Sequence, residues 1–207
     1  MNTIQLAIDF NAKGALSLVS GQWPPKTAFG FFRRSLNAIE SYCRLFEAND
    51  EEALMNHTLC FDNLSECSLD NKFTAIAVQL PGLKQDHLFV FPLALAYQLN
   101  PSVVEASKTN RVFSSADLTY CSAMSTYNIA LMYHFVALTT SNDKTNVLQK
   151  ARLLYNKCLE MINAVLSMSS SVEEIDNDMF MLQMVIWNNL AQAHYALGNI
   201  KACHRSL

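Results

Sequence analysis

A pattern of small and bulky residues occurs three times along this chain and constrains its fold more than any other feature. In each copy, a segment with a small residue near its centre precedes a second segment, in which a small residue stands four positions before a bulky one. Small side chains let two helices approach closely, and a bulky side chain fills the neighbouring groove. The pattern therefore predicts three antiparallel helical hairpins. The small residues of the first segments are Gly14, Ala130 and Ala191, and the pairs of the second segments are Ala28 with Phe32, Ala151 with Tyr155, and Cys203 with Leu207.

Apolar residues at steps of three and four indicate where the helices of these hairpins lie. Pro24 and Pro25 suit the first turn of a helix, where a missing N–H costs nothing. Ser171 with Glu174 forms a capping-box sequence, and Asn199 is suited to cap the last segment. The expected helices are Ile4 to Ser20, a helix with its apolar face between Ala28 and Phe46, Ser114 to about Leu138, a helix with its apolar face between Val147 and Val165, a long helix from Ser171 to just before Gly198, and a short one after Asn199.

The middle of the chain departs from helical spacing. Short mixed stretches alternate there with Pro81-Gly82, Pro92 and Asn100-Pro101, which favour turns over long helices. The stretches F-T-A-I-A-V-Q-L and H-L-F-V-F-P-L-A-L are strand candidates, and Pro81-Gly82 is the candidate turn between them. We therefore expect a first hairpin at residues 1–47, an irregular and partly mobile insert at 48–110 that contains a β-hairpin, and two further units at 111–207, the last of them incomplete.

The last copy of the pattern, W-N-N-L-A-Q-A-H-Y-A-L-G-N-I-K-A-C-H-R-S-L, resembles the tetratricopeptide repeat family, whose unit has about 34 residues and a W-x-x-L-G-x-x-Y…A-x-x-x-F signature. His194 and Cys203 stand where the family prefers Tyr and Ala. The resemblance covers about half of the chain and implies an all-α superhelix of hairpins that binds other proteins without catalysis. Matching residues are Trp187, Leu190, Ala191 and Gly198 in the last copy, Ile129, Ala130, Tyr133, Ala151 and Tyr155 in the middle copy, and Gly14, Gly21, Trp23, Ala28 and Phe32 in the first.

In such repeats the first helices line a concave binding surface. Asn128 and Asn189 each precede an apolar-small pair and so occupy equivalent positions, where a carboxamide can both donate to and accept from a peptide backbone. The alternative is that these asparagines cap or bridge helices internally. Family members that clamp an acidic chain terminus carry Lys and Arg there, so the sequence favours an apolar or neutral peptide or helix segment. The residues expected to share the surface by helical spacing are Tyr127, Leu131, His134 and Phe135 with Asn128, and Asn188, Gln192 and Tyr195 with Asn189.

Two alternatives of another class use histidine and cysteine. His57, Cys60 and Cys67 lie close together in the sequence, but they do not make up the usual four ligands of structural zinc. His134 and His194 are candidate acid-base groups, and each is also explained by simple packing. The chain has no nucleophile elbow, phosphate-binding glycine loop or dinucleotide fingerprint. We therefore expect no enzyme activity, no metal and no cofactor, and we expect most of the six cysteines to be small core residues.

Charge and hydropathy limit the partners. The net charge is −3 with scattered basic residues, and no stretch is apolar for long enough to span a bilayer, so we expect neither nucleic acid nor membrane as a partner. The N-terminal segment is unlike a secretion signal, which favours the cytoplasm, with the nucleus as the alternative, over secretion. Hydrophobic residues make up 51% and charged residues 16% of the chain, so part of the surface is expected to need cover.

The C-terminal segment from Asn199 to Leu207 is too short to be stable alone. It covers the preceding long helix only in part. We expect either a further helix in a longer chain or a partner to supply the missing cover. Self-association through this end is the third alternative for the function.

Overall fold

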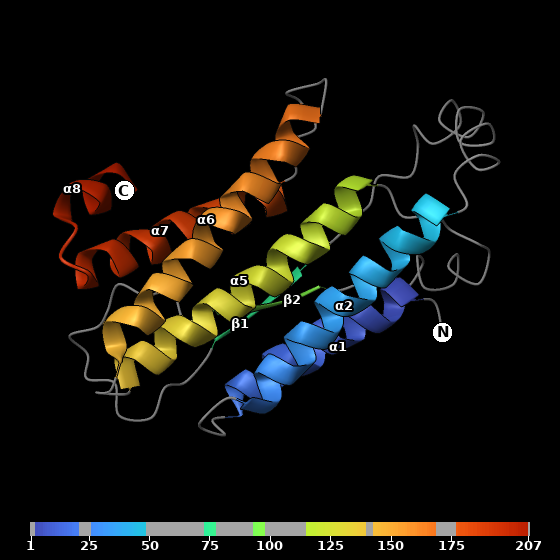
Figure 1. Cartoon of the computed structure of the whole chain (residues 1–207), viewed down its shortest axis with the longest axis horizontal. Helices are drawn as coiled ribbons and strands as arrows, with labels where there is room; N and C mark the ends of the chain where they lie inside the picture. Colours follow the sequence, from blue (N-terminus) through green and yellow to red (C-terminus); the bar gives the residue numbers. More distant parts are fainter. Residues whose placement is uncertain are drawn as a thin grey trace.

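The computed structural model describes residues 3–20, 26–48, 73–77, 93–97, 115–139, 143–168 and 177–206. Helices make up most of these residues, which confirms the predicted helical class. Figure 1 shows the helices lying side by side, with a short pair of strands behind α5. No helix in these ranges is both long enough and apolar enough to span a bilayer.

Helices α1 (Thr3–Val19) and α2 (Lys26–Ala48) form the first antiparallel pair (Figure 1). Gly14 on α1 faces the ring of Phe32 on α2, and a Cβ at position 14 would lie 2.5 Å from the Cε1 atom of Phe32. Phe32 and Ala28 are fully buried. The small residue thus lets an aromatic ring fill the space between the two helices, as the repeated pattern predicts. Residues 21–25, including the two expected N-terminal prolines, lie outside the described residues.

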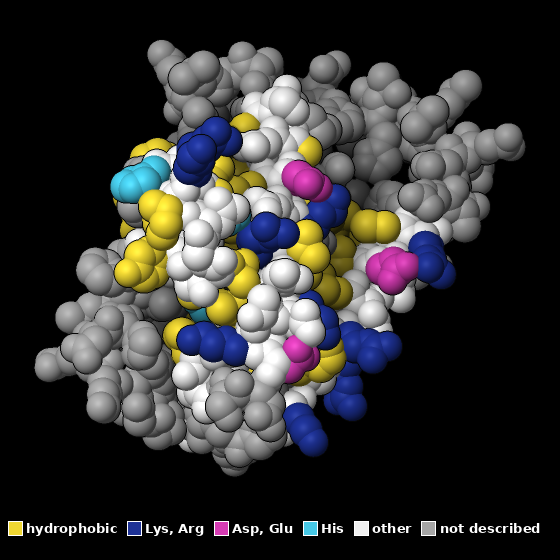
Figure 2. Space-filling model, turned by 60° about the vertical axis from the view of Figure 1, so that its left-hand side comes forward, with side chains coloured by type: hydrophobic (Ala, Val, Ile, Leu, Met, Phe, Trp, Pro, Cys, Tyr) yellow, Lys and Arg dark blue, Asp and Glu magenta, His cyan; other side chains and the backbone are white. Residues whose placement is uncertain are grey.

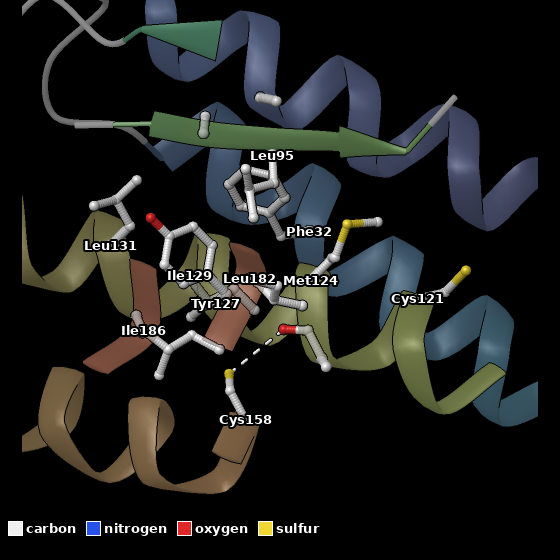
Figure 3. Close-up of a cluster of buried hydrophobic side chains, with 14 of the residues drawn as sticks. Phe32, Leu95, Cys121, Met124, Tyr127, Ile129, Leu131, Cys158, Leu182 and Ile186 are labelled. Carbon is white, nitrogen blue, oxygen red and sulfur yellow. Dashed lines mark hydrogen bonds between the residues drawn. The ribbon is translucent and has the colours of Figure 1, made fainter. Parts of the chain in front are cut away.

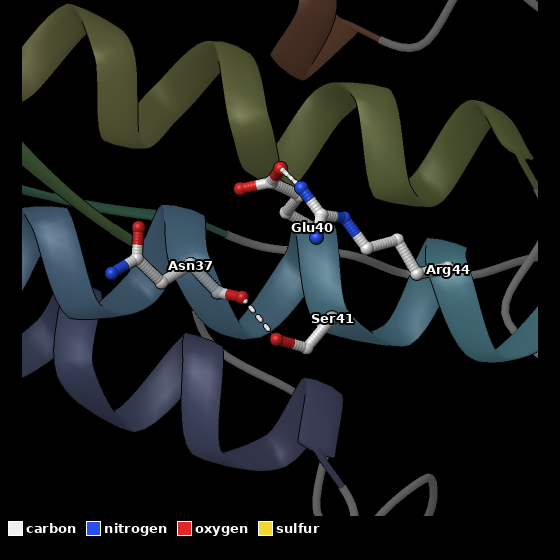
Figure 4. Close-up of polar contacts among 4 residues, drawn as sticks. All are labelled: Asn37, Glu40, Ser41 and Arg44. Atoms are coloured by element: carbon white, nitrogen blue, oxygen red, sulfur yellow. Dashed lines mark hydrogen bonds and ion pairs between the residues drawn. The ribbon is translucent and has the colours of Figure 1, made fainter.

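Polar side chains of α2 contact one another along the helix (Figure 4). Arg44 pairs with Glu40 one turn earlier, and both side chains are largely exposed. The hydroxyl of Ser41 donates to the backbone oxygen of Asn37 at 2.8 Å. Exposed pairs of this kind contribute at most about 0.5 kcal/mol. The apolar side of α2 therefore determines its position.

Helices α5 (Ser115–Thr139) and α6 (Lys144–Met168) form the second pair. Helix α5 is the central helix and contacts α1, α2, α6, α7 and β2. Most of its residues between Tyr120 and Ala137 are buried. Because this helix is covered on several sides, its sequence is apolar around most of its circumference rather than along one stripe.

Helices α7 (Asn177–Ala196) and α8 (Ile200–Arg205) form the third pair. Gly198 has φ +74°, a left-handed conformation that ends α7 at low steric cost. The Oδ1 atom of Asn199 accepts from the N–H of Ala202, which confirms Asn199 as the cap of α8. The expected capping box at Ser171 and Glu174 lies outside the described residues, as does Leu207.

Strands β1 (Phe73–Ala77) and β2 (Leu93–Tyr97) form a two-stranded antiparallel sheet, in which Ala75 lies opposite Leu95. β2 packs against α1 and α5. β1 falls within the first strand candidate. β2 overlaps the second candidate at residues 93–95 and continues to Tyr97. The proposed turn at Pro81-Gly82 lies outside the described residues, with most of the insert.

One hydrophobic cluster contains residues of α1, α2, α5, α6, α7 and β2. The side chain of Leu95 points from β2 toward α5 and into this cluster (Figure 3). Cys158 lies on the α6 side, where its thiol donates to the backbone oxygen of Ala123 at 3.4 Å. β2 therefore contributes buried side chains to the same cluster as the helices.

Candidate functional site

The carboxamide of Asn128 on α5 holds the backbone of β2. Its Oδ1 atom accepts from the N–H of Leu95 at 2.9 Å, and its Nδ2 atom donates to the carbonyl oxygen of the same residue at 2.7 Å. Asn128 and Leu95 are both at most 1% exposed. One side chain thus satisfies both polar groups of a buried backbone position, as a neighbouring strand would.

Three further polar side chains surround Asn128. Asn11 on α1 donates to the oxygen of Leu95 at 2.9 Å, and its own Oδ1 atom accepts from Asn128 at 3.0 Å. Ser125 donates to the Oδ1 atom of Asn11 at 3.3 Å, and its hydroxyl lies 3.0 Å from that of Ser35. Ser35 donates to the backbone oxygen of Ala7 at 2.7 Å. We call Asn11, Ser35, Ser125 and Asn128 the α1–α5 site.

The α1–α5 site is uncharged and closely packed. All four of its side chains are buried, and they come from three different helices. A cavity of about 10 Å³ lies beside Asn11, Ser35 and Ser125. This volume holds at most about one water molecule, so the cavity has no room for an organic ligand. The polar partner of this site is the backbone of β2.

A second polar cluster lies between α5, α6 and α7. Asn189 donates to the hydroxyl of Tyr127 at 3.2 Å, and the hydroxyl of Tyr155 lies 3.4 Å from the Nδ1 atom of His134. The rings of Tyr127 and Tyr155 are 6.0 Å apart. Burial is the main cause that raises the pKa of both tyrosines, and burial lowers the pKa of His134 from 6.5 to about 4. The imidazole of His134 is therefore neutral at pH 7 and accepts from a tyrosine hydroxyl or donates to it, depending on its tautomer.

Burial also suppresses the reactivity of the core thiols. It raises the pKa of Cys121 to about 12, with a smaller contribution from Asp117. It raises the pKa of Cys158 as well. Thiolates are the reactive form, so these cysteines are inert core residues. Cys203 is also buried, which agrees with the expected packing role of the cysteines.

The structure separates the predicted peptide-binding residues into two groups. Tyr127, Asn128, Leu131, His134 and Asn189 are buried. Asn188 and Gln192 are half-buried, and the Tyr195 side chain is 64% exposed. Phe135, expected on the same face, is also buried.

These contacts bear on the two roles considered for the asparagines. Asn128 binds a peptide backbone, but that backbone belongs to this chain. Asn189 bridges α7 to Tyr127 on α5, which is the internal role. The accessible part of the predicted surface therefore lies on α7 and consists of Asn188, Gln192 and Tyr195.

Helix α7 also carries apolar side chains at the surface. Phe180, Met184 and Trp187 follow one another at helical spacing and are 56%, 52% and 37% exposed. Met181 beside them is 50% exposed. Figure 2 looks at the molecule from the side of α6 to α8, where hydrophobic side chains reach the surface among Lys and Arg side chains. We call Phe180, Met181, Met184 and Trp187 the α7 apolar face.

No group of three or more potential metal ligands occurs among the residues that the structure describes. His57, Cys60 and Cys67, the candidates in the insert, lie outside those residues. His194 is half-buried, and burial and then Arg152 lower its pKa. His134 instead interacts with Tyr155 through its Nδ1 atom.

Sequence reasoning did not identify Asn11, Ser35, Ser125 and Leu95 as site residues. Asn11 and Ser35 stand on otherwise apolar helix faces, and a polar residue at such a position needs a hydrogen-bond partner in the core. That signal marks the residues but not their partner, because Leu95 is separated from Asn11 by 84 positions.

Comparisons of the chain with protein-family models, curated proteins and solved structures found no match.

Proposed function

We propose that this protein is a non-catalytic interaction scaffold of tetratricopeptide-repeat-like hairpins, which binds an extended peptide on the accessible part of its first helices, on α7. The order of packing supports this arrangement: α2 contacts α5, and α6 contacts α7, so each hairpin packs on the next. The small residues of the repeated pattern support it too, since Ala28, Ala130, Ala151 and Ala191 have no exposed surface.

The observation that carries the proposal is the pair of hydrogen bonds between Asn128 and Leu95. A first-helix carboxamide here satisfies the N–H and the C=O of one extended residue. Those groups are common to every peptide, so the same chemistry suits a partner segment. Neutral carboxamides without a neighbouring cation do not select a charged chain end.

We assign the accessible contacts of this surface to α7. Asn188 and Gln192 offer carboxamides, and Tyr195 offers an exposed ring with a hydroxyl. Aromatic side chains of this kind combine a large contact area with a polar group, and they often contribute a large share of the binding free energy at interfaces. An extended, neutral, partly apolar peptide is the ligand that fits these residues.

The absence of catalysis is part of the proposal. The buried histidine and the described core cysteines lack the exposure and the pKa values that an acid-base or nucleophilic group needs. The cytoplasm or the nucleus stays the predicted compartment.

The experiment that tests the proposal is a display selection of peptides against the intact chain, followed by affinity measurements. We expect Tyr195→Ala and Gln192→Ala to weaken the selected peptides at least about tenfold, as loss of a central interface contact does. Leu153→Ala is the matched control, because Leu153 is 59% exposed but lies on α6. Selected peptides that bind all three variants with equal affinity, or a selection that yields no binder, would contradict the proposal.

A second candidate function is self-association, and the α7 apolar face favours it. Exposed apolar side chains grouped on one helix mark interaction sites more often than single ones do. A second copy of the chain would cover this face through a symmetric contact of like with like.

A further inference from the structure

The hydrogen bonds of Leu95 define the two edges of β2. Neighbouring residues of a strand direct their backbone groups to opposite edges. The N–H and the carbonyl oxygen of Leu95 both form hydrogen bonds with side chains of the α1–α5 site, so these two groups face away from β1. Ala75 and Leu95 are therefore a non-hydrogen-bonded pair of the ladder, and Ala94 and Ala96 direct their backbone groups to β1. β2 is held by a strand along one edge and by side chains along the other.

The α1–α5 site is built for a backbone. The oxygen of Leu95 accepts from both Asn128 and Asn11, while its N–H donates to Asn128. Asn11 is held in turn by Ser125, which lies beside Ser35. These side chains are fixed by packing and by each other, so they lose little entropy on binding a strand. They recognise one extended residue through groups that every residue has.

The side chains of β2 add selectivity. Ala94 is 0% exposed and Leu95 is 1% exposed, so both faces of the strand are covered at this point. There is room for a small residue followed by a leucine-sized one. The four side chains of the site are uncharged, and burying an unpaired charge beside them would be costly.

From these contacts we propose that the α1–α5 site is a receptor for an extended, uncharged strand with a leucine after a small residue, and that β2 occupies it as an intramolecular ligand. A partner segment of the same chemistry replaces β2 and bonds to Asn128 and Asn11. This inference goes beyond the proposed function, because its site lies on α1, α2 and α5 and not on the accessible surface of α7. A two-stranded sheet has little stability of its own, so β2 stays in place through its contacts with α1 and α5, and a segment that makes the same contacts competes with it.

The test uses a fluorescent peptide with the sequence of residues 91–99, F-P-L-A-L-A-Y-Q-L, extended by lysines for solubility. Its binding to the intact wild-type chain is compared with binding to Leu95→Ala. This substitution weakens the intramolecular strand but leaves the receptor side chains unchanged. We expect Leu95→Ala to bind the peptide at least tenfold more tightly than the wild type does, and the further substitution Asn128→Ala to abolish that gain.

A modified peptide tests the hydrogen bond directly. Methylation of the amide nitrogen at the position of Leu95 removes the N–H that Asn128 accepts, and we expect at least a tenfold loss of binding. A peptide of the same composition in scrambled order is the control for nonspecific apolar binding.

Hydrogen exchange of the wild-type chain decides the question if Leu95→Ala does not fold. Saturating peptide should accelerate exchange of the amides of residues 93–97, because β2 leaves the site. Unchanged exchange in the wild type, or a folded Leu95→Ala that binds no more tightly, would make β2 a permanent part of the core and overturn the inference. Tyr195→Ala separates the two proposals, since it should weaken display-selected peptides and leave the 91–99 peptide unaffected.

Discussion

At the scale of single residues, the buried His134 makes stability depend on pH. Its pKa in the folded chain is about 4, below the ordinary 6.5, because burial disfavours the charged imidazolium. Between these two pKa values the unfolded chain binds the proton more readily than the folded chain does. The contribution of neutral His134 to the unfolding free energy is therefore fully present above about pH 6.5 and is lost as the pH drops toward 4. We expect His134 to account for a loss of about 3 kcal/mol, at about 1.4 kcal/mol per pH unit.

Urea denaturation of the wild type and of His134→Gln at several pH values between 7.5 and 4.5 measures this loss. His134→Gln should have the shallower dependence of the unfolding free energy on pH. His194→Gln is the control, and its dependence should stay close to that of the wild type, since His194 is more exposed. Parallel curves for the wild type and His134→Gln would mean that His134 titrates normally.

We expect the carboxamide of Asn128 to contribute strongly to the unfolding free energy, because it holds β2 in place. Asn128→Ala leaves the buried N–H of Leu95 without its acceptor and creates a small cavity. We expect it to lower the unfolding free energy by about 2–4 kcal/mol. Asn37→Ala on α2 is the matched control, because Asn37 is exposed, and we expect a change within about 0.5 kcal/mol. Chemical denaturation measures both, and similar values for the two variants would refute the assigned role.

At the scale of elements, two glycines on paired helices give opposite predictions. Gly14→Ala places a methyl group 2.5 Å from a carbon of the Phe32 ring, whereas a Cβ at Gly30 meets nothing within 4 Å. We expect Gly14→Ala to destabilise the chain by about 1–3 kcal/mol through overpacking. Gly30→Ala should stabilise it by about 0.5–1 kcal/mol, because alanine is the better helix former.

Thermal or urea unfolding of the two variants provides the comparison. The double variant Gly14→Ala/Phe32→Leu should lose less stability than the two single variants added together, since a smaller side chain relieves the contact. Stabilisation by Gly14→Ala would show that α1 and α2 are not packed as closely as the Phe32 contact requires.

The elements also show how far a sequence of this kind can be interpreted. The helix expected at Ile4 to Ser20 is Thr3–Val19, and the helix expected from Ser114 to about Leu138 is Ser115–Thr139. Helical spacing is a local signal, so these bounds follow from neighbouring residues. The contact of Asn128 with Leu95 joins residues 33 positions apart, and no local pattern specifies it.

The sequence identified Asn128 as a residue suited to bind a backbone but did not indicate whose backbone it binds. Its partner depends on how β2 folds back between α1 and α5. Asn189 stands at an equivalent position in the repeated pattern, yet its neighbour is the hydroxyl of Tyr127. Equivalent positions in a pattern can therefore differ in their contacts, since these depend on which residues the tertiary structure brings near.

At the scale of the whole molecule, we predict that the chain associates with itself through the α7 apolar face. Phe180, Met184 and Trp187 lie on one side of α7 and remain accessible to solvent. Burying apolar surface between two copies stabilises a dimer by roughly 25 cal/mol for each Å² that leaves water. We expect reversible self-association of the wild type in sedimentation velocity over a concentration series, and Met184→Lys should reduce it, because the ammonium group would be desolvated in the contact.

Leu153→Lys is the matched control for this prediction. Leu153 is exposed to a similar degree but lies on α6, so the lysine there should leave association unchanged. Both substitutions are at exposed positions and should change the unfolding free energy by less than about 0.5 kcal/mol, which separates an effect on association from an effect on folding. A wild-type chain that stays monomeric at every concentration would eliminate self-association, and the α7 apolar face would then be left to a peptide ligand, whose affinity Met184→Lys should reduce instead.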